Sequence, residues 1–94
     1  MKYHTYITAN KPHGVIYTGQ THELKDRIKK HKTKKYKNSF SARYNVDKLV
    51  WYKEYDTILE ARAMEKKLKA GSRVKKIALI EATNPEWKDL FFEL

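Results

Sequence analysis

The shortness of this chain limits its fold more than any other feature of the sequence. A domain of 94 residues buries only about 60 to 65% of the surface that its unfolded chain exposes. The core must therefore be compact and cannot enclose a large cofactor, so we expect one domain over residues 1–94 with a shallow working face. Cysteine is absent, which excludes disulfides, thiolate metal sites and cysteine nucleophiles.

The charge of the chain points to a polyanionic partner. Lys and Arg number 21 against 11 Asp and Glu, which gives a net charge of +10 at pH 7. A field of this strength attracts nucleic acid first and an anionic membrane surface second. No stretch approaches the ~20 apolar residues of a membrane span, and the N-terminus lacks the apolar core of a signal peptide. We therefore expect a cytoplasmic protein without a membrane partner.

The first third of the sequence predicts a β-hairpin followed by a helix. β-Branched and aromatic residues alternate from Lys2 to Thr8, and a second such run extends from Val15 to Gln20 after a turn signal at residues 10–14. Thr21 is in position to cap a helix that continues to about His31.

The rest of the chain predicts one more strand and two more helices. The expected elements are an irregular basic segment from Thr33 to Asn45, a strand from Leu49 to Tyr55, helices from Ile58 to about Ala70 and from Arg73 to about Thr83, and a C-terminal turn in which Trp87, Leu90, Phe91 and Phe92 pack on the core. Thr57 and Glu60 have the spacing of a capping box, Gly71 supplies a helix stop, and Ser72 caps the next helix. The predicted order is β-β-α-β-α-α.

Two charged residues interrupt the apolar face of the first predicted helix. At 100° per residue, Leu24, Arg27, Ile28 and His31 lie on one stripe. In the structural interpretation, Arg27 extends to solvent and His31 acts as a favourable cation at the helix C-terminus. In the functional interpretation, both residues belong to a site.

A carboxylate interrupts the apolar face of the second predicted helix in the same way. Ile58, Ala61, Glu65 and Leu68 share one stripe. Burying an unpaired carboxylate costs several kcal/mol, so Glu65 should meet a lysine, Arg27 or a metal ion. Mg²⁺ often binds one or two carboxylates together with waters and substrate phosphate, so one Glu would be enough.

Tyr6 and Tyr17 lie on the two predicted hairpin strands, where tyrosines are common and usually structural. A phenol has an ordinary pKa of about 10, so it becomes a general base near neutrality only when positive charge is close by. Arg27, His31 and a metal held by Glu65 are the groups that could provide this environment.

Basic residues are concentrated after the hairpin. We expect them to bind nucleic-acid phosphates rather than to form only a solvated basic face. The expected phosphate-binding residues are Lys25, Lys29, Lys30, Lys32, Lys34, Lys35, Lys37 and Arg43. The pattern does not distinguish DNA from RNA.

The order of these residues resembles that of the GIY-YIG nuclease family over nearly the whole chain. The shared positions are Tyr6, Tyr17-Thr18-Gly19, Leu24-x-x-Arg27-Ile28-x-x-His31, Ala61-x-x-x-Glu65-Lys66 and Asn84-Pro85. The chain is most similar to the short standalone bacterial members. It departs from the family pattern at His4-Thr5-Tyr6, where only the tyrosine is retained, and at Thr18, which replaces isoleucine.

The resemblance implies an α+β fold with a small three-stranded antiparallel sheet flanked by helices, whose hairpin and first two helices meet at one catalytic face. It implies a metal-dependent endonuclease acting on DNA, including branched or structured DNA, in repair, mobile-element mobility or defence. Tyr6 or Tyr17 would deprotonate the attacking water, Arg27 would stabilise the phosphate and His31 would assist. Glu65 would hold one Mg²⁺ or Mn²⁺. Asn84 corresponds to a family asparagine near the site. The alternative is a non-catalytic, basic nucleic-acid-binding module on the same fold.

Overall fold

The computed structural model describes residues 1–33 and 44–94, so most of the predicted irregular basic segment lies outside the described residues. Its sheet contains β1 (Tyr3–Ala9), β2 (Ile16–Thr21) and β3 (Lys48–Tyr55), in the antiparallel order β2-β1-β3. The predicted three-stranded antiparallel sheet is confirmed. β1 is therefore the central strand, and β2 and β3 form the two edges.

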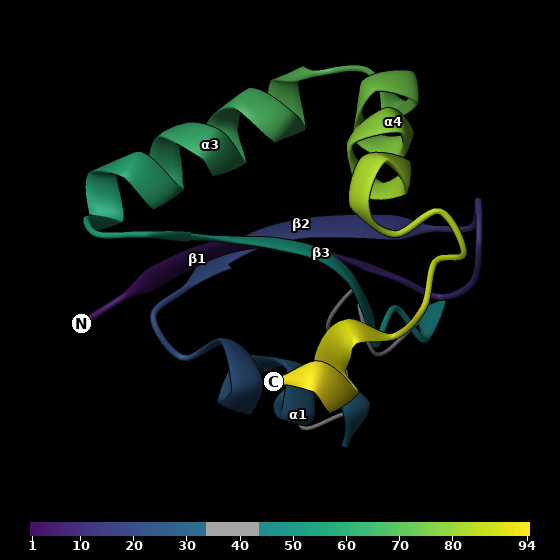
Figure 1. Cartoon of the computed structure of the whole chain (residues 1–94), viewed down its shortest axis with the longest axis horizontal. Coiled ribbons are helices and arrows are strands. Elements are labelled where there is room, and N and C mark those ends of the chain that lie inside the picture. The colour runs from purple at the N-terminus through teal and green to yellow at the C-terminus, as the bar shows by residue number, and fades with distance from the viewer. Residues whose placement is uncertain (34–43) are drawn as a thin grey trace.

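Helices cover both faces of this sheet. α3 (Ile58–Ala70) and α4 (Arg73–Thr83) lie on one face, whereas α1 (Leu24–Lys32) and the short 3₁₀ helix η1 (Leu90–Glu93) lie side by side on the other (Figure 1). This arrangement confirms the predicted α+β class and the element order. Within the described ranges, none of the helices is long and apolar enough to cross a membrane.

The helix ends follow the predicted capping residues except at α1. The Thr57 hydroxyl oxygen accepts the Glu60 backbone N–H at 3.2 Å, and Ser72 caps α4 in the same way. The prediction that Thr21 caps α1 is wrong, because Glu23 occupies the N-cap position and makes no side-chain capping bond. Thr21 instead pairs with His4 as the last residue of β2. The hairpin ladder thus extends one residue further than expected, and the helix starts later.

The sheet separates two apolar clusters because strand side chains alternate between its faces. The cluster beneath α3 and α4 contains the buried residues Ile7, Ala9, Val50, Trp51, Leu68, Ile80 and Trp87. The cluster beneath α1 and η1 contains the buried residues Tyr6, Leu24, Ile28 and Leu49. Tyr6 therefore faces α1, whereas its neighbour Ile7 faces α3 and α4.

The C-terminal turn packs on the sheet through some, but not all, of its predicted residues. Trp87 is buried, and Leu90 and Phe91 are partly buried. The prediction that Phe92 packs on the core is wrong, because this residue is 79% exposed. In a 3₁₀ turn, consecutive side chains point about 120° apart, so Phe91 faces the core and Phe92 faces solvent.

Candidate active site

Three aromatic rings from three different elements meet on the α1 face of the sheet. Tyr6 comes from β1, Tyr17 from β2 and His31 from the last turn of α1. The ring centroids are 6.4 Å apart for Tyr6 and Tyr17, 6.3 Å for Tyr6 and His31, and 6.0 Å for Tyr17 and His31. The Tyr6 hydroxyl lies 3.4 Å from Nε2 of His31. We call these three residues the aromatic cluster.

A glycine makes room for this cluster. Gly19 is paired with Tyr6 across the hairpin. A Cβ atom at position 19 would lie 2.5 Å from the Tyr6 hydroxyl oxygen, which is shorter than any tolerable carbon–oxygen contact. Gly19 is thus needed because the Tyr6 ring lies directly across the β2 backbone. The sequence alone did not reveal this role.

The environment of His31 favours the neutral imidazole. His31 is only 8% exposed. Burial is the main cause that lowers its pKa, the positive charge of Arg27 lowers the pKa further, and Asp47 opposes these effects. The interpretation of His31 as a helix-terminal cation is therefore not supported. A neutral ring with an unprotonated Nε2 can accept a hydrogen bond from the Tyr6 hydroxyl. His31 Nδ1 is buried and has no hydrogen-bond partner within residues 1–33 and 44–94.

Arg27 lies one helical turn before His31 and is exposed, whereas the other members of the predicted stripe, Leu24, Ile28 and His31, are buried. The guanidinium is thus at the solvent edge of the aromatic cluster, close enough for its charge to act on His31. A cation in this position can interact with a phosphate approaching from solvent. The contribution of Asp47 to the same ring could not be predicted, because it comes from a loop distant in sequence.

Glu65 lies on α3, on the opposite face of the sheet from α1 (Figure 1). Its side chain is 25% exposed and its Oε2 forms an ion pair with Lys69 Nζ at 3.1 Å. The structure therefore contains one of the predicted lysine pairs and does not bring Glu65 into the aromatic cluster. One turn before Glu65, α3 contacts β1, where the Thr5 hydroxyl donates to the Ala61 carbonyl oxygen at 2.7 Å.

A divalent ion at Glu65 would need most of its ligands from outside the protein. Within the described ranges, no three His, Cys, Asp or Glu residues come close enough to hold a metal. One carboxylate with waters and substrate phosphate oxygens nevertheless fits the chemistry of Mg²⁺. Exposed i,i+4 ion pairs contribute only about 0.3 to 0.5 kcal/mol, so a metal could displace Lys69 at little cost. The carboxylate is thus compatible with the expected metal.

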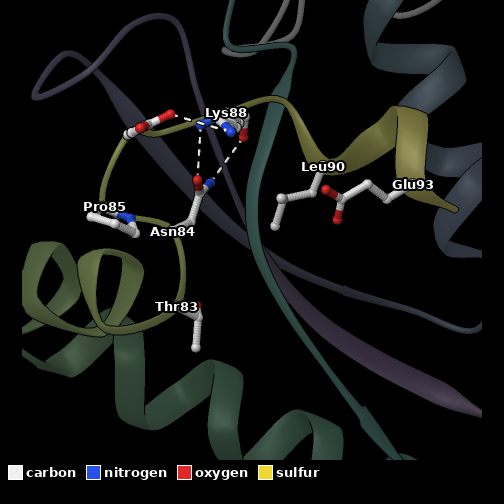
Figure 2. A pocket seen from close by; sticks show the side chains of 7 residues that line it. Thr83, Asn84, Pro85, Lys88, Leu90 and Glu93 are labelled. Atoms are coloured by element: carbon white, nitrogen blue, oxygen red, sulfur yellow. Dashed lines mark hydrogen bonds and ion pairs between the residues drawn. The ribbon is translucent and has the colours of Figure 1, made fainter.

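Asn84 has a structural role that uses its whole side-chain amide. It is the C-cap of α4 and is 5% exposed. Its Nδ2 donates to the carbonyl oxygens of Val50 and Lys88, at 3.1 and 2.9 Å, and its Oδ1 accepts the Lys88 N–H at 2.9 Å. Figure 2 shows the contacts with Lys88 beside a hollow also lined by Leu90 and Glu93. Asn84 thus joins the end of α4 to β3.

The predicted phosphate-binding residues divide into three groups. Lys25 and Lys29 are exposed on α1. Lys30 forms an i,i+4 ion pair with Asp26 at 2.9 Å, and Lys32 is paired with Asp89. The remaining four, Lys34, Lys35, Lys37 and Arg43, lie outside the described residues. Lys25 and Lys29 are therefore the two fully exposed members of this set among the residues that the structure describes.

Comparisons with known proteins agree with this architecture. The model of the GIY-YIG catalytic domain family matches residues 2–78. The solution NMR structure of a UPF0213 protein from Bacillus halodurans is 27% identical, with a TM-score of 0.58, and the match covers 95% of this chain and 93% of that chain. No curated protein matches significantly. Because the family match includes both tyrosines, α1 and Glu65, the chain belongs to the GIY-YIG family of nucleases.

Proposed function

We propose that this protein is a metal-dependent endonuclease that hydrolyses DNA phosphodiester bonds. The observation that carries the proposal is the aromatic cluster, in which two hairpin tyrosines contact the buried ring of His31 beside the exposed Arg27. A protein that only bound DNA would need lysines, not this arrangement of proton-transfer groups.

Tyr17 is the better candidate for the general base. A general base must reach the attacking water, and Tyr17 is partly exposed whereas Tyr6 is 1% exposed. The exposed guanidinium of Arg27, whose charge acts on His31, would lie beside the same water on the solvent side of the aromatic cluster. Tyr6 then acts through its contact with His31 Nε2, which holds the imidazole in place beside Tyr17.

Arg27 and Glu65 would act on the phosphate. The exposed guanidinium of Arg27 can bind phosphate oxygens and stabilise the charge that develops on them during hydrolysis. Glu65 would hold Mg²⁺ or Mn²⁺, which would supply positive charge to stabilise the phosphate during hydrolysis. Lys25 and Lys29 would bind phosphates further along the backbone.

A specific observation favours the second candidate function, a non-catalytic DNA-binding module. Glu65 is paired with Lys69 on the face of the sheet opposite the aromatic cluster. If this pair persisted with DNA bound, no carboxylate would hold a metal and the basic α1 would only bind DNA.

Cleavage assays with tyrosine variants test the proposal. Supercoiled, linear and branched DNA are incubated with and without Mg²⁺ or Mn²⁺. We expect metal-dependent cleavage that falls by about 10²- to 10⁴-fold in Tyr17→Phe and less in Tyr6→Phe, with DNA affinity retained in both because the rings remain. Tyr3→Phe is the matched control, since Tyr3 also lies on β1 but three positions before Tyr6, with His4 and Thr5 between them. Equal activity in all variants would make the tyrosines purely structural, and the absence of any cleavage would favour the binding module.

A further inference from the structure

Phe92 is an aromatic ring held in place but left open to solvent beside the DNA-facing helix. We propose that Phe92 is a stacking platform for an unpaired DNA base, so that the protein selects DNA with bulged, gapped or flipped-out nucleotides. This inference rests on the proposed function in one respect, namely that DNA meets the α1 face of the sheet.

Among the described residues, Phe91 and Lys32 are the neighbours of the Phe92 ring. Phe91 meets it edge-on, with centroids 5.4 Å apart and ring planes at 85°. The Lys32 ammonium lies 5.3 Å from the Phe92 centroid and 5.1 Å from that of Phe91. The rest of the ring is open, since the residue is 79% exposed. A cation beside an aromatic ring is attracted to its electron-rich face, so Lys32 helps to fix the orientation of the Phe92 ring.

Lys32, which contacts the Phe92 ring, is itself held in place by an ion pair with Asp89. Asp89 pairs with Lys32 and also accepts the backbone N–H groups of Leu49 and Phe91, each at 3.1 Å. These bonds tie η1 to both β3 and α1. A preordered ring loses less entropy on stacking than a mobile one.

The position of Phe92 matches the path expected for bound DNA. Lys32, which contacts Phe92, directly follows His31 of the aromatic cluster, and η1 lies beside α1 (Figure 1). Lys25 and Lys29 are exposed on the same helix. Phosphates bound by α1 would therefore bring neighbouring bases close to the open side of Phe92. The exposed acid Glu93 follows Phe92, and it would repel a phosphate there but not a neutral base.

Only an unpaired base can use such a platform. In a paired duplex the base faces are occupied by their neighbours, whereas bulges, gaps and flipped nucleotides expose a face. Base stacking on one aromatic side chain strengthens binding by about 5- to 150-fold. Because one exposed phenyl ring can stack with one base, we expect an effect near the lower limit, about 5- to 10-fold.

Binding without metal tests this inference independently of cleavage. Two duplexes are compared, identical except that one carries a single bulged 2-aminopurine nucleotide, and binding is measured in EDTA. We expect the protein to bind the bulged duplex about 5- to 10-fold more tightly and to quench 2-aminopurine fluorescence. Phe92→Ala should lose this preference and the quenching while its affinity for the paired duplex stays unchanged. Phe92→Trp should retain both.

The control variant is Leu59→Ala, because Leu59 is an equally exposed apolar residue, at 74%, on the opposite face of the sheet. It should bind both duplexes like the parent. Equal parental affinity for the two duplexes, or an unchanged preference in Phe92→Ala, would overturn the inference while leaving the proposed function intact if paired DNA is still cut. The inference would also be overturned if the parent protein were a dimer and Phe92→Ala a monomer, because a second copy of the chain would then cover the Phe92 ring. A protein that binds neither duplex would overturn both proposals.

Discussion

Replacing Glu65 with glutamine should abolish metal-dependent cleavage and leave the fold almost unchanged. The Glu65 and Lys69 side chains are 25% and 54% exposed, so their i,i+4 ion pair should contribute only about 0.3 to 0.5 kcal/mol. A domain of this length changes its melting temperature by about 4 to 8 °C per kcal/mol. The expected decrease for Glu65→Gln is therefore about 1 to 4 °C. A buried ion pair that lost its carboxylate would instead cost about 3 to 5 kcal/mol and lower the melting temperature by well over 10 °C.

Lys69→Gln is the matched control, because it breaks the same ion pair from the other end. Thermal unfolding and plasmid cleavage are measured for both variants over a range of Mg²⁺ concentrations. Both variants should melt within a few degrees of the parent, but only Glu65→Gln should lose cleavage at every concentration. Lys69→Gln should require less Mg²⁺ than the parent, since the metal no longer competes with the lysine for the carboxylate.

Two results would refute this reasoning. A Glu65→Gln variant that melts far below the parent and still cuts DNA would remove Glu65 from the active site. Equal losses of cleavage in both variants would show that the ion pair itself, rather than a metal on Glu65, is what cleavage requires.

Three further predictions concern DNA binding, stability and pH. Replacing Lys25 and Lys29 with glutamine should make the log-log salt dependence of DNA binding shallower by about two units; an unchanged slope would place the DNA elsewhere. Asn84→Ala should cost about 1 to 3 kcal/mol in urea unfolding, because it removes the hydrogen bond to the buried Val50 carbonyl oxygen, whereas a stable but inactive variant would indicate a direct role in cleavage. Burial lowers the pKa of His31 in the folded protein, so the unfolded chain binds more protons just below pH 6.5 and stability should fall as pH decreases from there. His31→Gln should flatten this dependence of melting temperature on pH, although His4, whose pKa burial also lowers, will keep part of it.

Local sequence patterns predicted most of the helices and strands, because the interactions behind those patterns form between residues close together in the chain. The Thr57 and Ser72 caps act within one turn of their own helices, and Gly71 ends α3 where the pattern placed the end. Thr21 failed as a predicted cap because its conformation depends on a partner strand. Phe92 failed because hydrophobicity indicates burial on average, whereas the direction of its side chain depends on how η1 meets the sheet.

The aromatic cluster could be anticipated in part. Helical periodicity placed His31 on the buried stripe of α1, and strand alternation left Tyr6 on one face of the sheet. What the sequence could not provide is the contact between them, since the 3.4 Å approach of Tyr6 to His31 requires Gly19 opposite Tyr6. The hydrogen bond from Asn84 to the Val50 carbonyl oxygen of β3 likewise joins segments distant in sequence, so local patterns could not predict it.

The positions of α1 and α3 restrict where a complete active site could form. The two helices lie on opposite faces of the sheet (Figure 1), so a substrate that meets both Arg27 and a metal on Glu65 must pass an edge of the sheet. α3 packs over β1 and β2, and β2 is the edge strand on that side. Tyr17 lies on this edge strand, whereas Tyr6 lies on the central strand. A phosphate that approaches the β2 edge would therefore meet the partly exposed Tyr17 before the buried Tyr6, which is a second reason to assign the general base to Tyr17 rather than Tyr6.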